Sequence, residues 1–372
     1  MIYLDNAATS YPKPASVINA VIKSLKYECG NPGRSSHRLS LAASEAIFAA
    51  RESICGLLNI EDPERVVFTY NATEALNLAI KTRVKEKCHV ITSDLEHNSV
   101  VRPIYSLSSR SQVEVSEFNT DENIAEEIKR LIRPDTKGIV TTAMSNVTGK
   151  QIDIEQLGRI ARQNKLFLIV DASQMLGHYR IDLSKLSCDV LCAPAHKGLL
   201  GIMGLGFAVF KEKVRLESFI EGGSGSDSLN PAMPLYLPDG YEAGTPATPA
   251  IAALRAGIEY LGKHGIESIS RHLDILTDEA RVRLYSINGI DVHAAEHGII
   301  SISGRGISST ALSSQLSDRA IATRGGYHCA PSAHKKLGTL KEGTVRLSFS
   351  HATTLRELDA LYKALKEIIA EV

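Results

Sequence analysis

The segments LFLIVDASQ (residues 166–174) and DVLCAPAHK (residues 189–197) decide the fold of this chain. Each contains a short apolar run that is typical of a buried strand, and each ends in polar residues. Asp171 follows directly on the first run, and Lys197 lies just beyond the second. Ligands of parallel sheets bind beyond the carboxyl ends of the strands, so both side chains are expected at a binding site.

The pairing of Asp171 with Lys197 indicates pyridoxal phosphate. A lysine amine forms an imine with the aldehyde of this cofactor, and a carboxylate keeps the pyridine nitrogen protonated, which makes the ring an electron sink. The pair alone leaves an ordinary alternative open, because an Asp after a strand often caps a helix and a loop Lys is often solvated. The rest of the sequence decides between the two interpretations.

Short apolar segments alternate with helical patterns between about residues 60 and 210. The expected strands are Val66–Thr69, His89–Thr92, Val113–Glu117, Gly138–Thr142, Phe167–Asp171, Val190–Ala193 and Gly206–Phe210. Helical patterns separate several of them, as in Glu74–Lys81, Asn123–Ile132 and Ile154–Asn164. This alternation predicts an α/β fold with a mainly parallel, seven-stranded sheet flanked by helices.

Segments outside this region have patterns of their own. His37–Leu58 is expected to be a long amphipathic helix, and its inner side comprises Leu39, Ala42, Ala43, Ala46, Ile47, Ala50, Ile54 and Leu57. The glycine- and proline-rich stretch 221–249 has the composition of a mobile loop. The last part is expected to contain helices Ala250–Lys263, Ile266–Ser286, Ser309–Asp318 and Thr354–Ala370, with strands Gly298–Ser303 and Val345–Phe349.

The length of 372 residues predicts two domains, because single hydrophobic cores stop growing below this size. We expect a large cofactor-binding α/β domain at residues 15–250. Residues 1–14 and 251–372 are expected to form a small α+β domain, which would carry the candidate nucleophile and the carboxylate-binding arginine described below.

Composition excludes several classes of function. Lys plus Arg and Asp plus Glu each number 42, and no basic stripe suggests nucleic-acid binding. The N-terminus lacks the pattern of a secretory signal, and no apolar run is long enough to span a membrane. The six cysteines lack the spacing of a disulfide framework, which predicts free thiols in the cytoplasm: Cys29, Cys55, Cys88, Cys188, Cys192 and Cys329.

Two further motifs have weaker interpretations. Cys188, Cys192 and His196 have the spacing of metal ligands, but structural zinc needs four ligands and no second pair follows, so we expect no metal. The segment GLLGIMGLG (198–206) follows Lys197 instead of opening a strand–helix unit, which argues against a nucleotide-binding loop.

Seven short motifs occur in one order that matches a known family. They are N-A-T-E at 71–74, E-H-N at 96–98, S-N-V-T-G at 145–149, D-A-S-Q at 171–174, H-K at 196–197, E-A-G-T-P at 242–246 and R-G-G-Y-H-C-A at 324–330. With these motifs the chain resembles the fold-type I pyridoxal-phosphate enzymes of the class V aminotransferase group, and most closely the cysteine desulfurases. The resemblance extends from Tyr3 to Arg346.

The resemblance implies a phosphate site at the N-A-T-E motif. Ala72 and Thr73 begin a helix after a sheet strand, and the free amides and positive dipole of a helix start bind phosphate. The Thr73 hydroxyl would add a donor. An ordinary cap, with Asn71 bonded to Glu74, is the alternative interpretation.

Other contacts to the cofactor also follow from the resemblance. His97 matches a histidine that stacks on the pyridine ring and can move protons. Asn146 matches a side chain near the phenolic oxygen and the substrate carboxylate, and Gln174 matches the donor to that oxygen. His196 matches a phosphate ligand. Thr245 matches a threonine that reaches the phosphate from the neighbouring subunit, which predicts a homodimer.

Cys329 is the implied nucleophile, which attacks the sulfur of a bound cysteine and leaves alanine and a protein persulfide. Arg324 and His328 are expected to activate this thiol, and Arg324 is also expected to bind substrate. Gly325 and Gly326 are expected to make the segment a mobile loop.

Arg346 matches the arginine that binds the α-carboxylate of the substrate through its guanidinium fork. The short spacing between the Cys329 and Arg346 positions resembles the short-loop, SufS-like desulfurases and the selenocysteine lyases. The substrate is therefore expected to be cysteine or selenocysteine. Because a short loop cannot swing far, sulfur is expected to leave through an acceptor protein or small thiol that approaches the site.

The sequence departs from the family pattern at two positions. Pro194 stands where relatives have a Ser or Thr that donates to the phosphate, and Tyr327 stands where many have His. Three alternatives stay open: a selenocysteine lyase, a class V aminotransferase or epimerase that does not use Cys329, and a sulfur carrier with a vestigial cofactor site.

Overall fold

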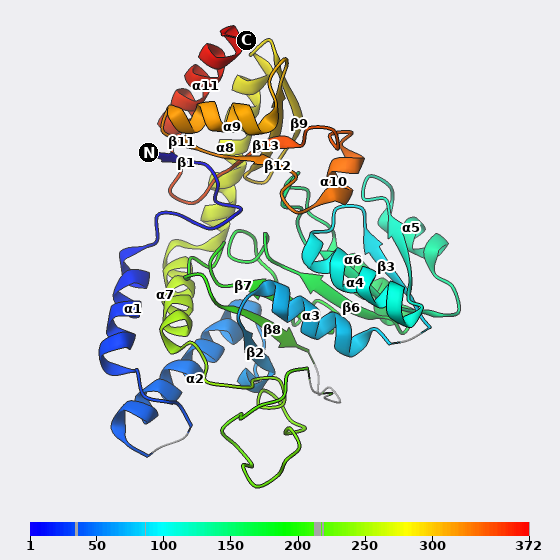
Figure 1. Cartoon of the computed structure of the whole chain (residues 1–372), viewed down its shortest axis with the longest axis vertical. Helices are drawn as coiled ribbons and strands as arrows, with labels where there is room; N and C mark the ends of the chain where they lie inside the picture. The colour runs from blue at the N-terminus through cyan, green and yellow to red at the C-terminus, as the bar shows by residue number, and fades with distance from the viewer. Residues whose placement is uncertain (34–35, 86, 212–216, 218, 372) are drawn as a thin grey trace.

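A seven-stranded sheet forms the centre of the larger part of the molecule (Figure 1). The computed structural model describes residues 1–371 except 34–35, 86, 212–216 and 218. The strand order is β2-β8-β7-β6-β5-β3-β4, and only β8 runs antiparallel to its neighbours. The strands are β2 (Val66–Thr69), β3 (His89–Ser93), β4 (Glu114–Phe118), β5 (Thr136–Thr142), β6 (Phe167–Asp171), β7 (Val190–Pro194) and β8 (Gly206–Phe210). The predicted mainly parallel, seven-stranded sheet is confirmed.

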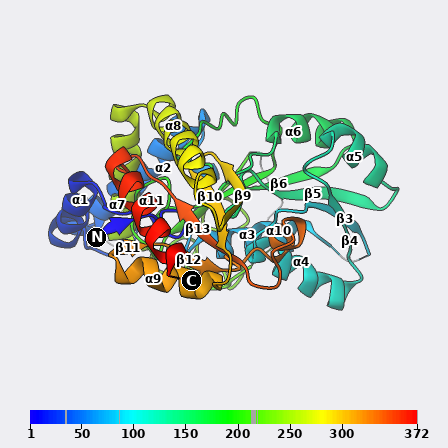
Figure 2. The ribbon, with the colours of Figure 1, turned by 90° about the horizontal axis from the view of Figure 1, so that it is seen from above.

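Helices cover both faces of this sheet (Figure 2). In β6, Leu168 and Val170 pack in one hydrophobic cluster and Ile169 packs in another, because successive strand residues point to opposite faces. The Ile169 face is covered by α3 (Ala72–Arg83) and α4 (Asn98–Ser111). The other face is covered by α2 (Arg38–Leu58), α5 (Ile124–Leu131), α6 (Ile154–Gln163) and α7 (Thr248–His264). Outside these layers, α1 (Ala15–Tyr27) packs on α7, and a 3-10 turn, η1 (Pro63–Arg65), precedes β2.

A smaller, antiparallel sheet of order β12-β13-β10-β9 belongs to the C-terminal part. Its strands are β9 (Ile290–Glu296), β10 (Ile299–Gly304), β12 (Arg324–Gly326) and β13 (Thr344–Ser348). The accompanying helices are α8 (Ile266–Tyr285), α9 (Ser309–Asp318), α10 (Pro331–Lys336) and α11 (Leu355–Ala370). β1 (Ile2–Tyr3) pairs in parallel with β11 (Ile321–Ala322), so the N-terminus lies beside this part (Figure 1).

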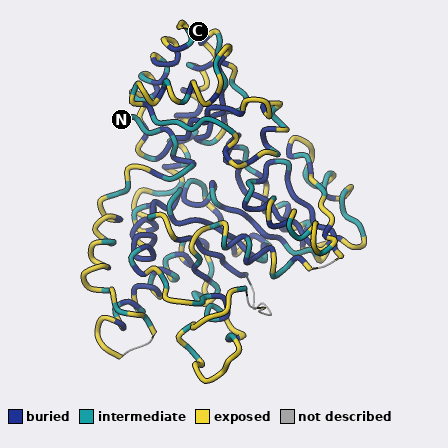
Figure 3. Tube along the Cα trace, viewed as in Figure 1, coloured by how far each residue is buried: buried dark blue, intermediate teal, exposed yellow. Residues whose placement is uncertain are grey.

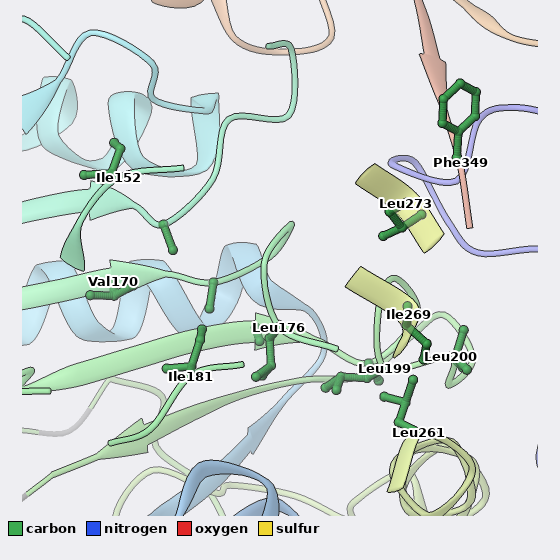
Figure 4. Packing of buried hydrophobic residues seen from close by; sticks show 14 of the residues in the cluster. Ile152, Val170, Leu176, Ile181, Leu199, Leu200, Leu261, Ile269, Leu273 and Phe349 are labelled. Carbon is green, nitrogen blue, oxygen red and sulfur yellow. The ribbon is translucent and has the colours of Figure 1, made fainter. Parts of the chain in front are cut away.

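One hydrophobic cluster connects the two parts (Figure 4). Val170 and Leu176 from the large sheet region share it with Leu261 of α7 and with Ile269 and Leu273 of α8. The helix α7 also continues unbroken across residue 250. The division into domains at residues 14/15 and 250/251 stays a prediction.

Several local expectations need correction. Leu39 is 48% exposed and lies in the first turn of α2, so it is not on the inner side of this helix. The strands β1, β9, β11 and β12 and the helices α1, α4 and α10 were not predicted, and strand ends elsewhere differ by one or two residues. Between Glu221 and Ala247 the chain forms no helix or strand. None of the described helices combines the length and apolar character needed to cross a membrane.

Candidate active site

A pocket lies at the carboxyl ends of the parallel strands of the large sheet. The pocket has a cavity volume of about 110 Å³. Every residue that was predicted to bind the cofactor lines this pocket except Thr245: Ala72, Thr73, His97, Asn146, Asp171, Gln174, His196 and Lys197. The sheet thus brings together side chains that are far apart in the sequence.

The start of α3 provides backbone donors to the pocket. Asn71 caps the helix through its Oδ1, which accepts the backbone N–H of Glu74 at 2.9 Å, so the predicted cap is present. The amides of Ala72 and Thr73 have no acceptor within the described part of the chain, and they remain available to an anion. A Cβ on Gly206 would lie 2.3 Å from the carbonyl carbon of Asn71, so glycine at the start of β8 permits this close approach.

His97 is held in one orientation as the cap of α4. Its Nδ1 accepts the backbone N–H of Ser99 at 3.1 Å, and the Ser99 hydroxyl lies 2.8 Å from that of Thr73. Burial lowers the pKa of His97 to about 4, with Lys197 acting in the same direction against the opposing effect of Asp171. The imidazole is therefore neutral near pH 7, and its proton is on Nε2 because Nδ1 is an acceptor.

Asp171 and Lys197 supply the carboxylate and the amine of the pocket. The Asp171 side chain is 3% exposed and accepts the backbone N–H of Ser173 at 2.9 Å. Burial lowers the pKa of Lys197 to about 8; Asp171 opposes this effect, whereas Arg346 and Arg324 add to it. A neutral amine is the nucleophilic form, so this environment favours attack on an aldehyde.

His196 has an unpaired nitrogen in the pocket wall. Its Nδ1 is buried and has no hydrogen-bond partner among the described residues. Burial, with the charges of Lys197 and Lys13, lowers the pKa of His196 to about 4, so the ring is neutral. Because a buried unpaired nitrogen is costly, its presence indicates a ligand at this position. Pro194 lines the same pocket without contributing a donor.

Cys329 is an exposed thiol in an unusual backbone conformation. Both His328 (φ 50°) and Cys329 (φ 58°) lie in the left-handed region, which is unfavourable for residues with a Cβ. The carbonyl of His328 accepts from the Asn146 side chain at 2.8 Å, and the carbonyl of Cys329 accepts from the Asn98 amide at 2.7 Å. Both bonds come from the large sheet region, and they hold the thiol in place.

Only one of the two predicted activators of Cys329 is positioned for that role. Nη2 of Arg324 lies 3.9 Å from the Cys329 Sγ. The imidazole of His328 is buried, its Nε2 lies 3.1 Å from the Thr344 carbonyl oxygen, and burial lowers its pKa to about 2. His328 therefore carries no charge that could stabilise a thiolate.

The glycines before Cys329 do not form the expected mobile loop. Gly325 and Gly326 belong to β12 and pair with Val345 and Thr344 of β13. A Cβ on Gly325 would lie 2.5 Å from the carbonyl oxygen of Ser309 in α9. Glycine is thus needed for close packing of the strand on the helix, and the sequence could not separate this cause from mobility.

Arg346 is almost completely enclosed. Its side chain is 1% exposed, Nη2 donates to Asp5 Oδ1 at 2.7 Å, and Nη1 donates to the Asn146 carbonyl at 3.1 Å. Burial lowers the pKa of Arg346, and Asp5 opposes that effect. Arg324 lies directly opposite on β12. Arg346 thus contacts Asn146, which lines the pocket.

A family model described as aminotransferase class-V matches residues 2–361. This chain belongs to the class-V aminotransferase family. A relative from Methanothermobacter thermautotrophicus is 32% identical over 99% of this chain and 94% of its own length, and one from Pyrococcus abyssi is 30% identical over 99% and 94%; both are named probable cysteine desulfurase. A solved apo structure of a cysteine desulfurase from Thermococcus onnurineus NA1 has a TM-score of 0.92 and 26% identity, covering 100% of this chain and 95% of that one.

Membership of the class-V family implies pyridoxal phosphate, and the residues of the pocket fit that group. An anionic phosphate is matched by the amides of Ala72 and Thr73 and by the unpaired Nδ1 of His196. The buried amine of Lys197 suits the aldehyde of the cofactor. The buried carboxylate of Asp171 suits its protonated pyridine nitrogen. The predicted membership of the family is confirmed.

Two amides of this class-V site are engaged by backbone in the structure. Gln174 Nε2 donates to the Ala7 carbonyl at 3.0 Å, and Asn146 Nδ2 donates to His328 as described above. Each amide nitrogen has a second hydrogen for a ligand. Their predicted contacts with the cofactor oxygen stay predictions.

Thr245 lies outside the pocket of its own chain. It is exposed, and it lines a separate hollow together with Tyr70, Phe219 and Tyr241. Within one class-V chain it therefore cannot reach the phosphate site. The predicted role of Thr245 depends on a second subunit.

Three residues of the site were missed in the sequence. Ser99 links His97 to Thr73, Asp5 pairs with Arg346, and Lys13 donates to the carbonyl of His196 at 2.9 Å. Asp5 lies near the start of the region of resemblance, but nothing in its spacing indicates a partner 341 positions away. In the described part of the chain, no cluster of three or more His, Cys, Asp or Glu side chains could bind a metal ion.

Proposed function

We propose that this class-V protein is a pyridoxal-phosphate-dependent cysteine desulfurase, which converts L-cysteine to L-alanine and retains the sulfur on Cys329. The observation that carries the proposal is the exposed thiol of Cys329 on a turn that is bonded to Asn146, a residue that lines the pocket of Asp171 and Lys197. An ordinary aminotransferase needs no thiol at this place. The names of the relatives support the same activity.

The roles of the pocket residues follow from their chemistry. Ala72, Thr73 and His196 would bind the phosphate, and Asp171 would hold the proton on the ring nitrogen. When bound, pyridoxal phosphate supplies an electron sink for bonds next to the amino carbon of the substrate. Lys197 would hold the aldehyde, and its amine would take the α-proton of the substrate and return it. Neutral His97 would lie against the ring and present its Nε2 proton.

Cys329 performs the sulfur transfer. Its thiolate attacks the sulfur of the substrate cysteine, and a new S–S bond forms as the bond between the substrate Cβ and its sulfur breaks. The electron pair stays with the substrate, and a proton added at Cβ completes alanine. The guanidinium of Arg324 lies beside the attacking sulfur, with Nη2 3.9 Å from Sγ.

The backbone hydrogen bonds around Cys329 limit how far the persulfide can travel. Both carbonyls of the left-handed turn are bonded, and β12 is anchored to β13. The sulfur therefore passes to an acceptor protein or small thiol that comes to the exposed Cys329.

The active form in this proposal is a homodimer in the cytoplasm. Thr245 needs a second subunit to reach a phosphate site. Much of α1 is exposed (Figure 3), and Ile18, Ile22 and Leu25 are exposed apolar residues of this helix. An exposed apolar stripe is typical of an interface between subunits. Each of the six cysteines, all in the described ranges, is free, as expected in a reducing compartment.

Product analysis tests the proposed activity. Wild-type protein with pyridoxal phosphate should release alanine from cysteine, with sulfide when a thiol acceptor is added. Cys329→Ala should lose this release but keep the cofactor, whereas the control Cys29→Ala, at another exposed thiol, should behave as wild type. If Cys329→Ala releases alanine at the wild-type rate, the desulfurase proposal fails and an aminotransferase or epimerase takes its place. Selenocysteine, assayed in parallel, distinguishes a selenocysteine lyase.

A further inference from the structure

The segment of residues 5–13, here called the N-terminal strap, runs along the edge of the candidate site. Its hydrogen bonds reach three residues of that site, which come from different strands and loops. The bonds join Asp5 to Arg346, Ala7 to Gln174, and Ser10 and Lys13 to His196. The strap therefore connects the arginine near Cys329 with the phosphate side of the pocket.

Asp5 makes the only ion pair of Arg346 within the described residues, at 2.7 Å. A buried guanidinium without a counter-charge is strongly unfavourable, so the Asp5 carboxylate compensates for the enclosure of Arg346. Nη1 and Nη2 are engaged, whereas Nε is buried and has no partner in the described part of the chain. An unpaired Nε–H next to a held Nη2 is the edge that a carboxylate binds in a bidentate manner.

The strap fixes Asp5 in place. Asn6, its neighbour, donates from Nδ2 to the Ser348 carbonyl at 3.0 Å and accepts the amide of Tyr11 at 3.1 Å. The amide of Ala7 donates to the Ser348 hydroxyl at 2.9 Å. The backbone that directly follows Asp5 is thus fixed against Ser348 of β13.

The charge of Asp5 has a second consequence for Arg346. Arg324 and Arg346 are direct neighbours across β12 and β13. Like charges that face each other across two strands repel. Removing the Asp5 charge would leave this repulsion uncompensated and would allow the guanidinium of Arg346 to turn.

We infer that Asp5 is a positioning residue, which orients Arg346 so that its unpaired Nε–H and the adjoining Nη2 receive the carboxylate of an amino-acid substrate. The inference rests on the proposed function, because it assigns Arg346 to the substrate carboxylate. Asp5 itself touches no reacting atom. Its effect is on the binding of the carboxylate and not on the sulfur chemistry.

Substitution of Asp5 tests this inference in the holoenzyme. Asp5→Asn keeps the shape of the side chain and removes its charge, so KM for cysteine should rise about tenfold while kcat stays within about twofold. Binding of L-alanine, measured by calorimetry, should weaken by a similar factor. Binding of cysteamine, which has the amine and thiol but no carboxylate, should not change.

A matched control breaks an ordinary surface pair. Asp291→Asn removes the partner of Arg305, at 3.2 Å in an exposed position, and should leave all these constants unchanged. Should Asp5→Asn fail to fold by circular dichroism, Asp5→Glu replaces it; the longer side chain moves the carboxylate, so L-alanine should bind more weakly and cysteamine as before.

The inference is overturned if folded Asp5→Asn binds L-alanine as tightly as the wild type or more tightly. It is also overturned if the variant loses as much affinity for cysteamine as for L-alanine. Tighter binding would mean that Asp5 competes with the substrate. The desulfurase proposal has its own test, since it fails if the wild type forms no alanine from cysteine. The comparison of L-alanine with cysteamine measures binding without turnover, so the two failures can be told apart.

Discussion

The backbone amide of Asn98 donates to the carbonyl oxygen of Cys329 at 2.7 Å. Asn98 begins α4 directly after His97, so this bond ties the proposed nucleophile to the helix that orients the proposed ring-stacking histidine. A free amide at a helix start is thereby used to hold a strained turn. The position of the thiol depends on the large sheet region as well as on its own strand.

The left-handed conformation of Cys329 gives a first prediction. Glycine adopts a φ near 58° without strain, whereas alanine does not. Cys329→Gly should therefore be more stable than Cys329→Ala by about 1 kcal/mol. The free energy of unfolding in urea measures this difference.

Lys363 provides a control in which the stability difference between the glycine and alanine variants should have the opposite sign. It is exposed in the helix α11, where alanine is favoured over glycine by about 1 kcal/mol. Lys363→Ala should therefore be more stable than Lys363→Gly. Equal stability of the two Cys329 variants would contradict the strain at the thiol.

The low pKa of Lys197 gives a second prediction. Burial lowers this pKa to about 8 and Asp171 opposes the shift, so Asp171→Asn should lower it further. In cofactor-free protein, the rate at which an amine reagent labels Lys197 should rise with pH up to about 8 and then level off. In Asp171→Asn the same rise should occur at lower pH, because the neutral amine forms earlier.

Peptide mass spectrometry measures this labelling residue by residue. Lys363, on the exposed surface of α11, provides the internal control, since Asp171→Asn should not change its rate. If the labelling rate of Lys197 in Asp171→Asn rises at the same pH as in the wild type, or at a higher pH, Asp171 does not raise the pKa of this amine.

The sequence predicted the parts of the site that depend on regular local patterns. Asp171 and Lys197 follow apolar runs that are typical of buried strands, so their place at one end of the sheet followed from the predicted parallel topology. Asn71 and Glu74 likewise predicted the start of α3 from a local capping pattern.

The parts that were missed depend on contacts between distant segments. Asp5 meets Arg346 only after the N-terminus has paired beside β11, and no local pattern specifies that pairing. β12 has three residues, two of them glycine, and therefore has no strand-like composition. His328 looked like an activator beside Cys329 because adjacency in sequence does not give the direction of a side chain.

The close approach of β8 to the start of α3 gives a third prediction. Gly206→Ala would place a methyl group 2.3 Å from the Asn71 carbonyl carbon and 2.6 Å from the Ala72 nitrogen, both of them backbone atoms that cannot give way easily. The helix start must then move, so affinity for pyridoxal phosphate should fall by about tenfold or more.

Equilibrium dialysis of pyridoxal phosphate, and of inorganic phosphate as a probe of the anion site alone, measures the effect. Gly56→Ala is the matched control, because a Cβ at Gly56 in α2 meets nothing within 4 Å. It should leave the affinity unchanged and stabilise the helix by about 1 kcal/mol. If Gly206→Ala binds inorganic phosphate with the affinity of the wild type, the start of α3 does not bind the phosphate.

The buried carboxyl of Glu96 gives a fourth prediction. It is 1% exposed and accepts the amides of Ser93 and Thr142, which lie at 3.3 Å and 2.9 Å from Oε1. Burial raises the pKa of Glu96 to about 8, and the nearby charge of Asp171 adds to this effect. Near pH 7 the folded protein therefore keeps this proton, whereas the unfolded chain has lost it.

Stability should consequently fall as the pH rises through this window. Between about pH 5 and pH 8 unfolding releases the Glu96 proton, so each increase in pH favours the unfolded state. Glu96→Gln removes this contribution. The free energy of unfolding of wild type minus that of Glu96→Gln, measured in urea at several pH values, should decrease from about pH 5 to pH 8. A difference that stays constant, or grows with pH, would show that Glu96 is ionised in the folded protein, because only a retained proton gives a downward slope.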